Sequence, residues 1–214
     1  MANTKKTLLL TGASRGIGHA TVKHFHAAEW RVITVSRQPF DKICPWPQGE
    51  KDHIQGDLND VEHYDAIIAS IRAKLAEPET GGRLAALVNN AGGQFMTPLE
   101  AISAKGWEAV VNTNLTGGFL VARECFTQCM ARRGGAIVNI VADMWGSMPG
   151  MGHSGAARAG MVSFTETAAV EWGPRGVRVN AVAPGYVASS GMDNYPEAMA
   201  PMIREMAKTL PIGR

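Results

Sequence analysis

Short apolar segments alternate with helical ones along most of this chain, and this alternation constrains the fold more than any other feature. Apolar runs predict strands at 7–11, 31–36, 53–55, 84–89, 136–141 and 177–182. Apolar residues at helical spacing predict helices at 16–28, 61–76, 102–132 and 154–172. Nearly continuous apolar strands separated by helices are typical of a parallel sheet with helices on both faces. We therefore expect an α/β fold built on a doubly wound parallel sheet.

The composition indicates one globular unit. The chain has 214 residues, 45% of them hydrophobic, and contains no internal repeat, low-complexity tract or linker. A chain of this length buries roughly 70% of its unfolded surface on folding, so we expect a single domain over residues 1–214. The net charge is only +2 and no run of like charges occurs. These properties argue against nucleic acid or a membrane surface as a partner.

The N-terminus and the cysteines bear on the compartment. Residues 1–6 precede only a short apolar run, and no stretch approaches the ~20 apolar residues of a membrane span. Cys44, Cys125 and Cys129 are an odd number in a chain too large for a disulfide scaffold, at spacings that suit zinc poorly. We expect buried free thiols, no metal site and a cytoplasmic location.

A glycine-rich turn lies between the first predicted strand and the first predicted helix. Gly12, Gly16 and Gly18 fall within Thr11–Gly18 in a G-x-x-x-G-x-G spacing. Glycine permits a tight turn and a close approach of the backbone to a pyrophosphate, and the helix N-terminus that follows favours an anion. The strand–turn–helix context predicts dinucleotide binding. The alternative is a tight turn that binds nothing.

Charges near this turn indicate which dinucleotide is bound. A site for NAD usually has an acidic residue about 20 residues after the glycine turn, to hold the ribose 2′-hydroxyl. Here Arg37 lies 19 residues after Gly18, and no acidic residue stands between it and Asp41. Arg15 adds a second guanidinium inside the turn. Because guanidiniums suit a phosphate, we predict NADP(H); the alternative is that both arginines are solvated surface charges.

Several segments between residues 5 and 190 match the motifs of one enzyme family in that family's order. They are Thr11–Gly18 (T-G-x-x-x-G-x-G), Asp57, Asn89–Gly92 (N-N-A-G), Asn114, and Val177–Asn180 with Pro184–Gly185. On these residues the chain resembles the short-chain dehydrogenase/reductase family.

The resemblance implies a Rossmann fold with strand order 3-2-1-4-5-6, and a cofactor across the C-terminal ends of the strands. The family's seventh strand, which commonly builds an oligomer interface, would follow the point where this chain stops, so we expect that strand to be missing and a homo-oligomer to be weakened. The implied cofactor-binding residues are Gly12, Ser14, Arg15, Gly16, Ile17, Gly18, Arg37, Asp57, Leu58, Asn90, Ala91, Gly92, Arg158, Pro184, Gly185 and Val187.

The catalytic positions depart from the family's pattern of Asn, Ser, Tyr and Lys. Asn114 is unchanged, whereas Val141 takes the Ser position, Ser154 the Tyr position and Arg158 the Lys position. A serine hydroxyl is too weak an acid to replace a tuned phenol, and an arginine cannot join a proton relay. Reducing a ketone needs an acid at the oxygen, but reducing a conjugated double bond passes through an enolate that hydrogen-bond donors can stabilise.

The substitutions therefore favour reduction of an enoyl thioester. The segment 153–160 resembles the trans-2-enoyl-CoA reductase and 2,4-dienoyl-CoA reductase branches, although the tyrosine of each branch is replaced. We expect Ser154 to contact the substrate oxygen, unless it is a helix N-cap, and Arg158 to contact the cofactor ribose and the enolate, unless it forms a structural salt bridge. Asn114 completes the catalytic set, and His153 and Asp143 are candidate proton donors. The alternatives are a carbonyl reductase for 3-oxoacyl or ketone substrates, and an NADP(H)-binding protein without turnover.

Overall fold

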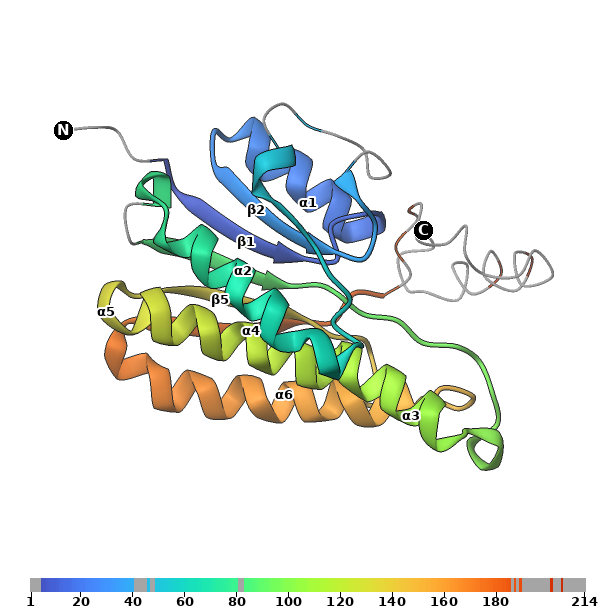
Figure 1. Cartoon of the computed structure of the whole chain (residues 1–214). Helices are drawn as coiled ribbons and strands as arrows, with labels where there is room; N and C mark the ends of the chain where they lie inside the picture. Colours follow the sequence, from blue (N-terminus) through green and yellow to red (C-terminus); the bar gives the residue numbers. More distant parts are fainter. Residues whose placement is uncertain are drawn as a thin grey trace.

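A six-stranded parallel sheet forms the centre of the computed structural model, which describes residues 5–40, 46, 49–80, 83–185, 187, 189, 201 and 205. Its strands are β1 (Thr7–Thr11), β2 (Arg31–Ser36), β3 (His53–Gln55), β4 (Leu84–Asn89), β5 (Gly135–Ile140) and β6 (Val177–Val182). Their order is β3-β2-β1-β4-β5-β6, and every pair is parallel (Figure 1). The predicted fold class and strand order are confirmed. The expectation of a missing seventh strand concerns a segment that would follow residue 214, so it stays a prediction.

Helices connect the strands. They are α1 (Gly16–Ala27), α2 (Tyr64–Ala76), α3 (Ala104–Val111), α4 (Gly117–Cys125), α5 (Ala131–Arg133) and α6 (Gly152–Trp172). Two π-helical turns, η6 (Asn112–Thr116) and η7 (Phe126–Met130), join α3, α4 and α5 into one continuous helix. Short 3₁₀ turns are η2 (Glu50–Asp52), η3 (Val61–His63), η4 (Pro78–Thr80), η5 (Leu99–Ala101) and η8 (Gly173–Arg175).

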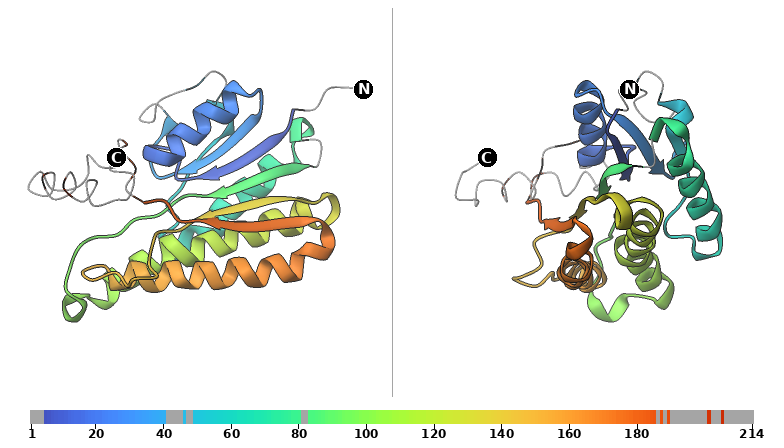
Figure 2. Two further views of the ribbon diagram at one scale, coloured as in Figure 1. Left: turned by 180° about the vertical axis from the view of Figure 1, so that it is seen from behind. Right: turned by 90° about the vertical axis from the view of Figure 1, so that its left-hand side faces the viewer.

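Helices cover both faces of the sheet (Figure 2), and an apolar cluster lies on each face. The larger one packs α2, α4 and α6 against the side chains that point to one face, among them Leu9, Ile33 and Ile137. The smaller one packs α1 against the alternate residues, such as Leu8 and Leu10. Both faces of β1 and β2 are therefore buried, which explains why these strands read as continuous apolar runs.

The predicted ends of most elements agree with the structure to within one or two residues, but one difference matters for the site. Helix α6 begins at Gly152, before the predicted start at Ser154. His153 and Ser154 therefore lie inside its first turn, and the residue that precedes the helix is Met151. The interpretation of Ser154 as an N-cap is wrong for this reason.

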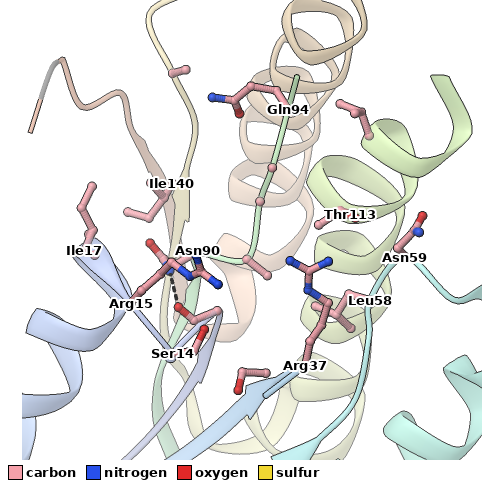
Figure 3. Close-up of a pocket in the computed structure, with 18 of the residues that line it drawn as sticks. Ser14, Arg15, Ile17, Arg37, Leu58, Asn59, Asn90, Gln94, Thr113 and Ile140 are labelled. Carbon is pink, nitrogen blue, oxygen red and sulfur yellow. Dashed lines mark hydrogen bonds between the residues drawn. The ribbon is translucent and has the colours of Figure 1, made fainter. Parts of the chain in front are cut away.

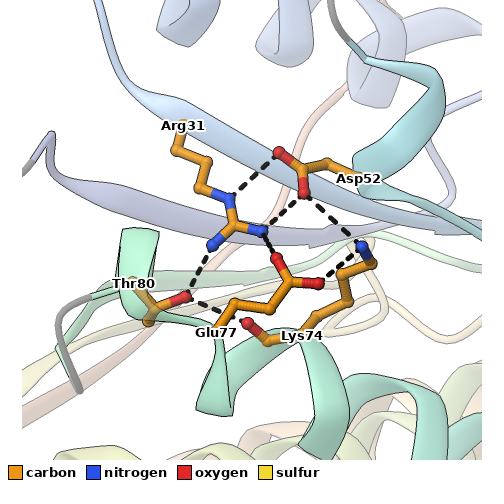
Figure 4. A network of polar contacts seen from close by, with 5 residues as sticks. All are labelled: Arg31, Asp52, Lys74, Glu77 and Thr80. Atoms are coloured by element: carbon orange, nitrogen blue, oxygen red, sulfur yellow. Dashed lines mark hydrogen bonds and ion pairs between the residues drawn. The ribbon is translucent and has the colours of Figure 1, made fainter.

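At the N-terminal end of β2, opposite the glycine turn, a network of charged groups ties four elements together (Figure 4). Arg31 donates to both carboxylate oxygens of Asp52, at 3.0 and 2.6 Å, and to Thr80 Oγ1 at 2.8 Å. It also bonds Glu77, which accepts from Lys74 Nζ at 2.8 Å. Arg31 and Asp52 are both at least nine-tenths buried, so their charges need the compensation that this network supplies.

Two further features concern the predicted environment. No helix in the described ranges combines the length and apolarity that crossing a bilayer requires. Cys125 and Cys129 are buried free thiols, and burial raises the pKa of both. Cys44 lies outside the described residues.

Candidate functional site

A cavity of about 990 Å³ opens at the C-terminal ends of the parallel strands (Figure 3). Every predicted cofactor-binding residue except Gly18 and Val187 lines it. Sequence reasoning missed the other lining residues, which are Val35, Ser36, Gly56, Asn59, Gly93, Gln94, Phe95, Met96, Ala109, Val110, Thr113, Ile140, Val141, Ala142 and Ser189. Most of these follow a strand directly or flank a predicted residue, so strand ends would have been the signal for them.

Hydrogen bonds from the loop after β4 hold the glycine turn in place. Thr11 Oγ1 accepts from the N–H groups of Asn90 and Ala91, at 3.1 and 3.0 Å. The Asn90 side-chain amide donates to the carbonyls of Thr11 and Gly12, at 3.2 and 3.0 Å. Gly12 has a φ of +72°, a region that favours glycine, and its N–H donates to the Val35 carbonyl at 2.8 Å. Two motifs far apart in the sequence thus form one rigid wall of the cavity.

Gly18 allows helix α1 to pack directly against this wall. A Cβ atom at Gly18 would lie 2.1 Å from the Gly12 carbonyl oxygen and 2.4 Å from the Asn90 amide nitrogen. Helix α1 can therefore approach the turn only because residue 18 has no side chain. The helix begins without a side-chain cap and without an acidic residue in its first turn, an arrangement that suits an anion at its N-terminus.

Two arginines and one aspartate mark the β2 end of the cavity. Arg15 lies in the glycine turn and Arg37 directly follows β2, and both line the cavity (Figure 3). The Arg37 side chain is 69% exposed, and its Nη1 lies 4.0 Å from Asp57 Oδ2. The other oxygen of Asp57 accepts the Asn59 N–H at 3.0 Å. This end of the cavity therefore combines two cations with one carboxylate.

Asn114 is buried beneath the cavity and does not line it. Its side-chain amide donates to the carbonyls of Gly93 and Val110, at 2.6 and 2.8 Å, and its oxygen accepts the Gly93 N–H at 3.2 Å. The side chain thus fixes the loop that runs from Asn90 toward Phe95. Its geometry suits holding this loop rather than contacting a substrate.

Arg158 is a buried cation at the opposite end of the cavity. It is 8% exposed, and its Nη1 donates to the Ile140 carbonyl at 2.6 Å. Burial lowers its pKa from 12.5 to about 10. Among the described residues, its Nε has no hydrogen-bond partner and no carboxylate forms a salt bridge with it. A Cβ atom at Gly92 would lie 2.5 Å from Arg158 Nη2, so glycine there lets the guanidinium reach the loop. The described residues supply no structural salt bridge for Arg158.

Ser154 and His153 lie beside Arg158 in the first turn of α6. Ser154 is 1% exposed, and its hydroxyl has no partner among the residues described. The fully buried His153 ring accepts the Ser154 N–H at Nδ1, 2.9 Å away, and packs edge-to-face on Phe95 with a centroid distance of 4.5 Å. Because Nδ1 accepts this bond, the ring N–H is on Nε2, which has no partner among the described residues.

Neither candidate proton donor lines the cavity. Asp143 is exposed in the loop after β5, and His153 lies behind Phe95. Val187, predicted to bind cofactor, is 42% exposed and also lies outside the lining. The structure thus brings together Arg158 and most of the predicted cofactor residues, whereas the buried Ser154 is not among the lining residues.

Phe95 is a lining residue that the sequence interpretation missed. Its ring fills a notch at Gly106 of α3, where a Cβ atom would lie 2.9 Å from Phe95 Cζ, and it covers His153 on α6. Nearby, the Thr97 N–H donates to the Gly150 carbonyl at 2.9 Å, tying the loop after β4 to the loop after β5. These two loops form the apolar mouth of the cavity.

The model of the short chain dehydrogenase family matches residues 6–200. The chain belongs to this family. Membership places it among oxidoreductases, in agreement with the position of the cavity at the C-terminal ends of the strands.

Curated relatives of this short-chain dehydrogenase have several described activities. FixR of Bradyrhizobium diazoefficiens is 40% identical over 90% of this chain and 71% of its own length. A probable 2,4-dienoyl-CoA reductase of Bacillus subtilis is 34% identical, over 98% of this chain and 84% of its own. A 3-oxoacyl-acyl-carrier-protein reductase of Synechocystis is 36% identical, over 90% and 78%.

Solved structures agree with the fold. A citronellol catabolism dehydrogenase, AtuB, of Pseudomonas aeruginosa is 45% identical with a TM-score of 0.71, covering 90% of this chain and 77% of that one. An oxidoreductase of Brucella ovis in complex with a partially ordered NAD is 38% identical with a TM-score of 0.77, covering 96% and 91%.

Proposed function

We propose that this short-chain dehydrogenase is an NADP(H)-dependent reductase that transfers hydride to a double bond conjugated with a thioester carbonyl. Its partner would be a small acyl thioester. The proposal has three parts, concerning the dinucleotide, its 2′-phosphate and the reacting oxygen.

The glycine turn fits a dinucleotide pyrophosphate. The Gly12 position would place a Cβ 2.8 Å from the Ala91 backbone, and Gly18 allows α1 to point its N-terminus at the cavity. The residues that would hold the cofactor are the lining ones named above, from the glycine turn, the β4 loop and Pro184–Gly185. When bound, the nicotinamide supplies the hydride.

Charge at the β2 end supports a 2′-phosphate. Arg15 and Arg37 line the cavity there, and the residue directly after β2 is Arg37 rather than the acid that usually binds a ribose 2′-hydroxyl. Asp57 lies 4.0 Å from Arg37 and offsets part of its charge. We assign NADP(H) because two guanidiniums line this end of the cavity, where Asp57 is the one carboxylate among the described lining residues.

The buried guanidinium of Arg158 is the observation that carries the reaction class. A desolvated cation without a carboxylate is costly unless an anion joins it. Adding hydride to the β-carbon of an enoyl thioester moves negative charge to the carbonyl oxygen, and Arg158 can balance that charge. The Ser154 hydroxyl, one helical turn away, is a second donor that has no partner among the described residues. Preorganised donors of this kind stabilise an oxyanion, and the α-carbon then takes its proton from water.

NADPH oxidation tests this proposal with crotonyl-CoA, 2-octenoyl-CoA, acetoacetyl-CoA and a simple ketone as substrates. We expect consumption with the two enoyl thioesters. Consumption with acetoacetyl-CoA alone would contradict the double-bond proposal and favour a 3-oxoacyl reductase, the activity named for the Synechocystis relative.

A protein that binds NADP(H) without turnover must also be distinguished from an active reductase. Neither predicted proton donor lines the cavity, which is the observation that favours a nucleotide-binding protein. NADPH fluorescence titration distinguishes the two cases, because tight binding with no consumption of any substrate would overturn catalysis and retain the cofactor assignment.

A further inference from the structure

The loop that carries Arg37 is held by side chains of β3, and we propose that His53 and Gln55 position Arg37 for the 2′-phosphate. This inference rests on the proposed NADP(H) specificity. It assigns the selectivity for NADP(H) over NAD(H) to Arg37 together with the hydrogen bonds from His53 and Gln55, which we call the brace.

The brace consists of hydrogen bonds to consecutive carbonyl groups. Gln55 Nε2 donates to the Arg37 carbonyl at 3.2 Å. His53 Nε2 lies 2.9 Å from the Gln38 carbonyl, and Ser36 Oγ donates to the same carbonyl at 3.1 Å. The backbone on both sides of the peptide bond between residues 37 and 38 is thereby fixed.

The His53 ring links this loop to the body of the sheet. A carbonyl can only accept, so His53 Nε2 carries the proton, and Nδ1 accepts the Thr34 hydroxyl at 2.9 Å. Thr34 is fully buried in β2 and is the registered partner of His53. The His53 ring therefore connects the buried Thr34 of β2 to the loop that follows β2.

Strand geometry explains why these two residues serve together. His53 and Gln55 are two apart in β3, so their side chains share one face, while Ile54 points to the core. Residue 39 is proline, which restricts Gln38 to extended conformations. The chain directly after Arg37 is therefore restricted as well as hydrogen-bonded.

Positioning matters here because the Arg37 side chain is long and mostly exposed. It is 69% exposed, and its one described ion pair, with Asp57, is at 4.0 Å. Such a side chain loses much rotamer freedom when it binds phosphate, and a backbone that is already fixed avoids a further entropy loss from ordering the loop. We therefore expect removal of the brace to weaken recognition of the 2′-phosphate and leave the rest of the dinucleotide site unchanged.

Calorimetric titration with adenosine 2′,5′-bisphosphate and with adenosine 5′-monophosphate tests the brace, because the two probes differ in the 2′-phosphate. We expect Gln55→Ala and His53→Ala each to weaken bisphosphate binding about three- to tenfold, with less than a twofold change for the monophosphate. Ser70→Ala is the matched control, since it removes another exposed side-chain bond to a carbonyl, on α2, and should change neither affinity.

Arg37→Ala separates this inference from the proposed function. If that variant binds the bisphosphate normally, the NADP(H) assignment fails. If it loses about tenfold while both β3 variants bind normally, the assignment stands and the brace is overturned. Equal weakening of both probes by the β3 variants would also overturn it, because it would indicate a general structural role.

A double variant gives the final check. Because the β3 residues act through Arg37, Gln55→Ala should cause no further loss in the Arg37→Ala background. An additive loss there would contradict positioning. Should His53→Ala fail to fold, Gln55→Ala alone decides, since Gln55 is exposed and removing its side chain leaves the core intact.

Discussion

The surroundings of Arg158 could not be predicted from its residue type. Its place in the family's lysine position predicts a cationic group near the cofactor, but not that the guanidinium is 8% exposed without a carboxylate partner in the described part of the chain. The lowering of its pKa to about 10 corresponds to roughly 3 kcal/mol of unfavourable burial. This cost is present at every pH below about 10, because the folded side chain stays charged there.

Replacing Arg158 with methionine should separate stability from function. Arg158→Met removes the buried charge and keeps an apolar stem, although the Ile140 carbonyl loses its donor. We expect the free energy of unfolding to stay level or rise by about 1–2 kcal/mol, and enoyl thioester reduction to fall about 100-fold. Urea unfolding and initial rates measure these two effects. Arg175→Met, at an exposed arginine, should alter neither. Strong destabilisation with normal turnover would make Arg158 a structural residue.

Single residues also show where sequence reasoning fails. Gly12 and Gly18 were predictable, because a backbone that must approach closely admits only one residue type. The start of α6 was not. Glycine at 152 is a poor helix former, and Met151 gives no capping signal. Tertiary contacts fix this start instead: Gly152 packs against Leu99, and Thr97 bonds the Gly150 carbonyl.

At the scale of elements, the long helix after β4 was predicted but its π-helical turns were not. In an α-helix the carbonyl of Val110 would bond the backbone N–H of residue 114. Here the Asn114 side chain donates to that carbonyl at 2.8 Å. A side chain that competes for a backbone acceptor disturbs the regular ladder. Apolar periodicity carries no information about this competition.

The charged network at the N-terminal end of β2 should dominate the stability of that region. Asp52→Ala leaves Arg31 buried without its two-oxygen partner, so we expect a loss of about 3–5 kcal/mol in the free energy of unfolding. Urea denaturation measures it. The control is Lys5→Ala at the exposed pair with Glu29, which should change stability little. A small effect for Asp52→Ala would show that Glu77 alone can satisfy Arg31.

Strand β3 should make the fold sensitive to mild acid. Burial lowers the pKa of His53 from its ordinary value of 6.5, although its bond to the Gln38 carbonyl opposes the shift. As the pH falls below about 6.5, the unfolded chain therefore binds more protons than the folded chain does. The free energy of unfolding is highest above about pH 6.5 and falls as the pH drops toward the folded-state pKa. Burial also lowers the pKa of His19, which contributes with the same sign.

Chemical unfolding at pH 7.5 and pH 5.5 measures this acid sensitivity. His53→Gln cannot take up a proton there, so we expect it to lose less stability between the two pH values than the unsubstituted protein loses. Gln55→Ala changes a neighbouring contact without removing a titratable group, and should keep the original difference. An unchanged pH dependence in His53→Gln would contradict the assignment.

At the scale of the whole molecule, alternation of apolar strands and helices was enough to predict a parallel sheet, because parallel strands need crossover connections and buried faces. It was not enough to order the strands. Periodicity says which residues are buried, not which strand lies beside β1; the order came from the family resemblance. The wall formed by the glycine turn and Asn90 shows why, since its bonds join residues 78 to 80 positions apart.

That wall makes dinucleotide binding a property of the whole fold. The cavity draws on the ends of β1, β2, β4 and β5 and on α6, so a bound dinucleotide links elements that would separate on unfolding. Ligand at 100 times its dissociation constant adds about 2.7 kcal/mol to the free energy of unfolding. For a chain of this size that raises the melting temperature by roughly 5–10 °C.

We expect NADPH to raise the melting temperature by this amount, NADH at equal concentration to raise it less, and Arg37→Ala to remove the difference between the two. Thermal unfolding followed by circular dichroism measures all three. Equal shifts with NADPH and NADH in the unsubstituted protein would reject selection by the 2′-phosphate, and no shift with either would reject the dinucleotide site, because a ligand that bound the folded cavity alone could not leave the melting temperature unchanged.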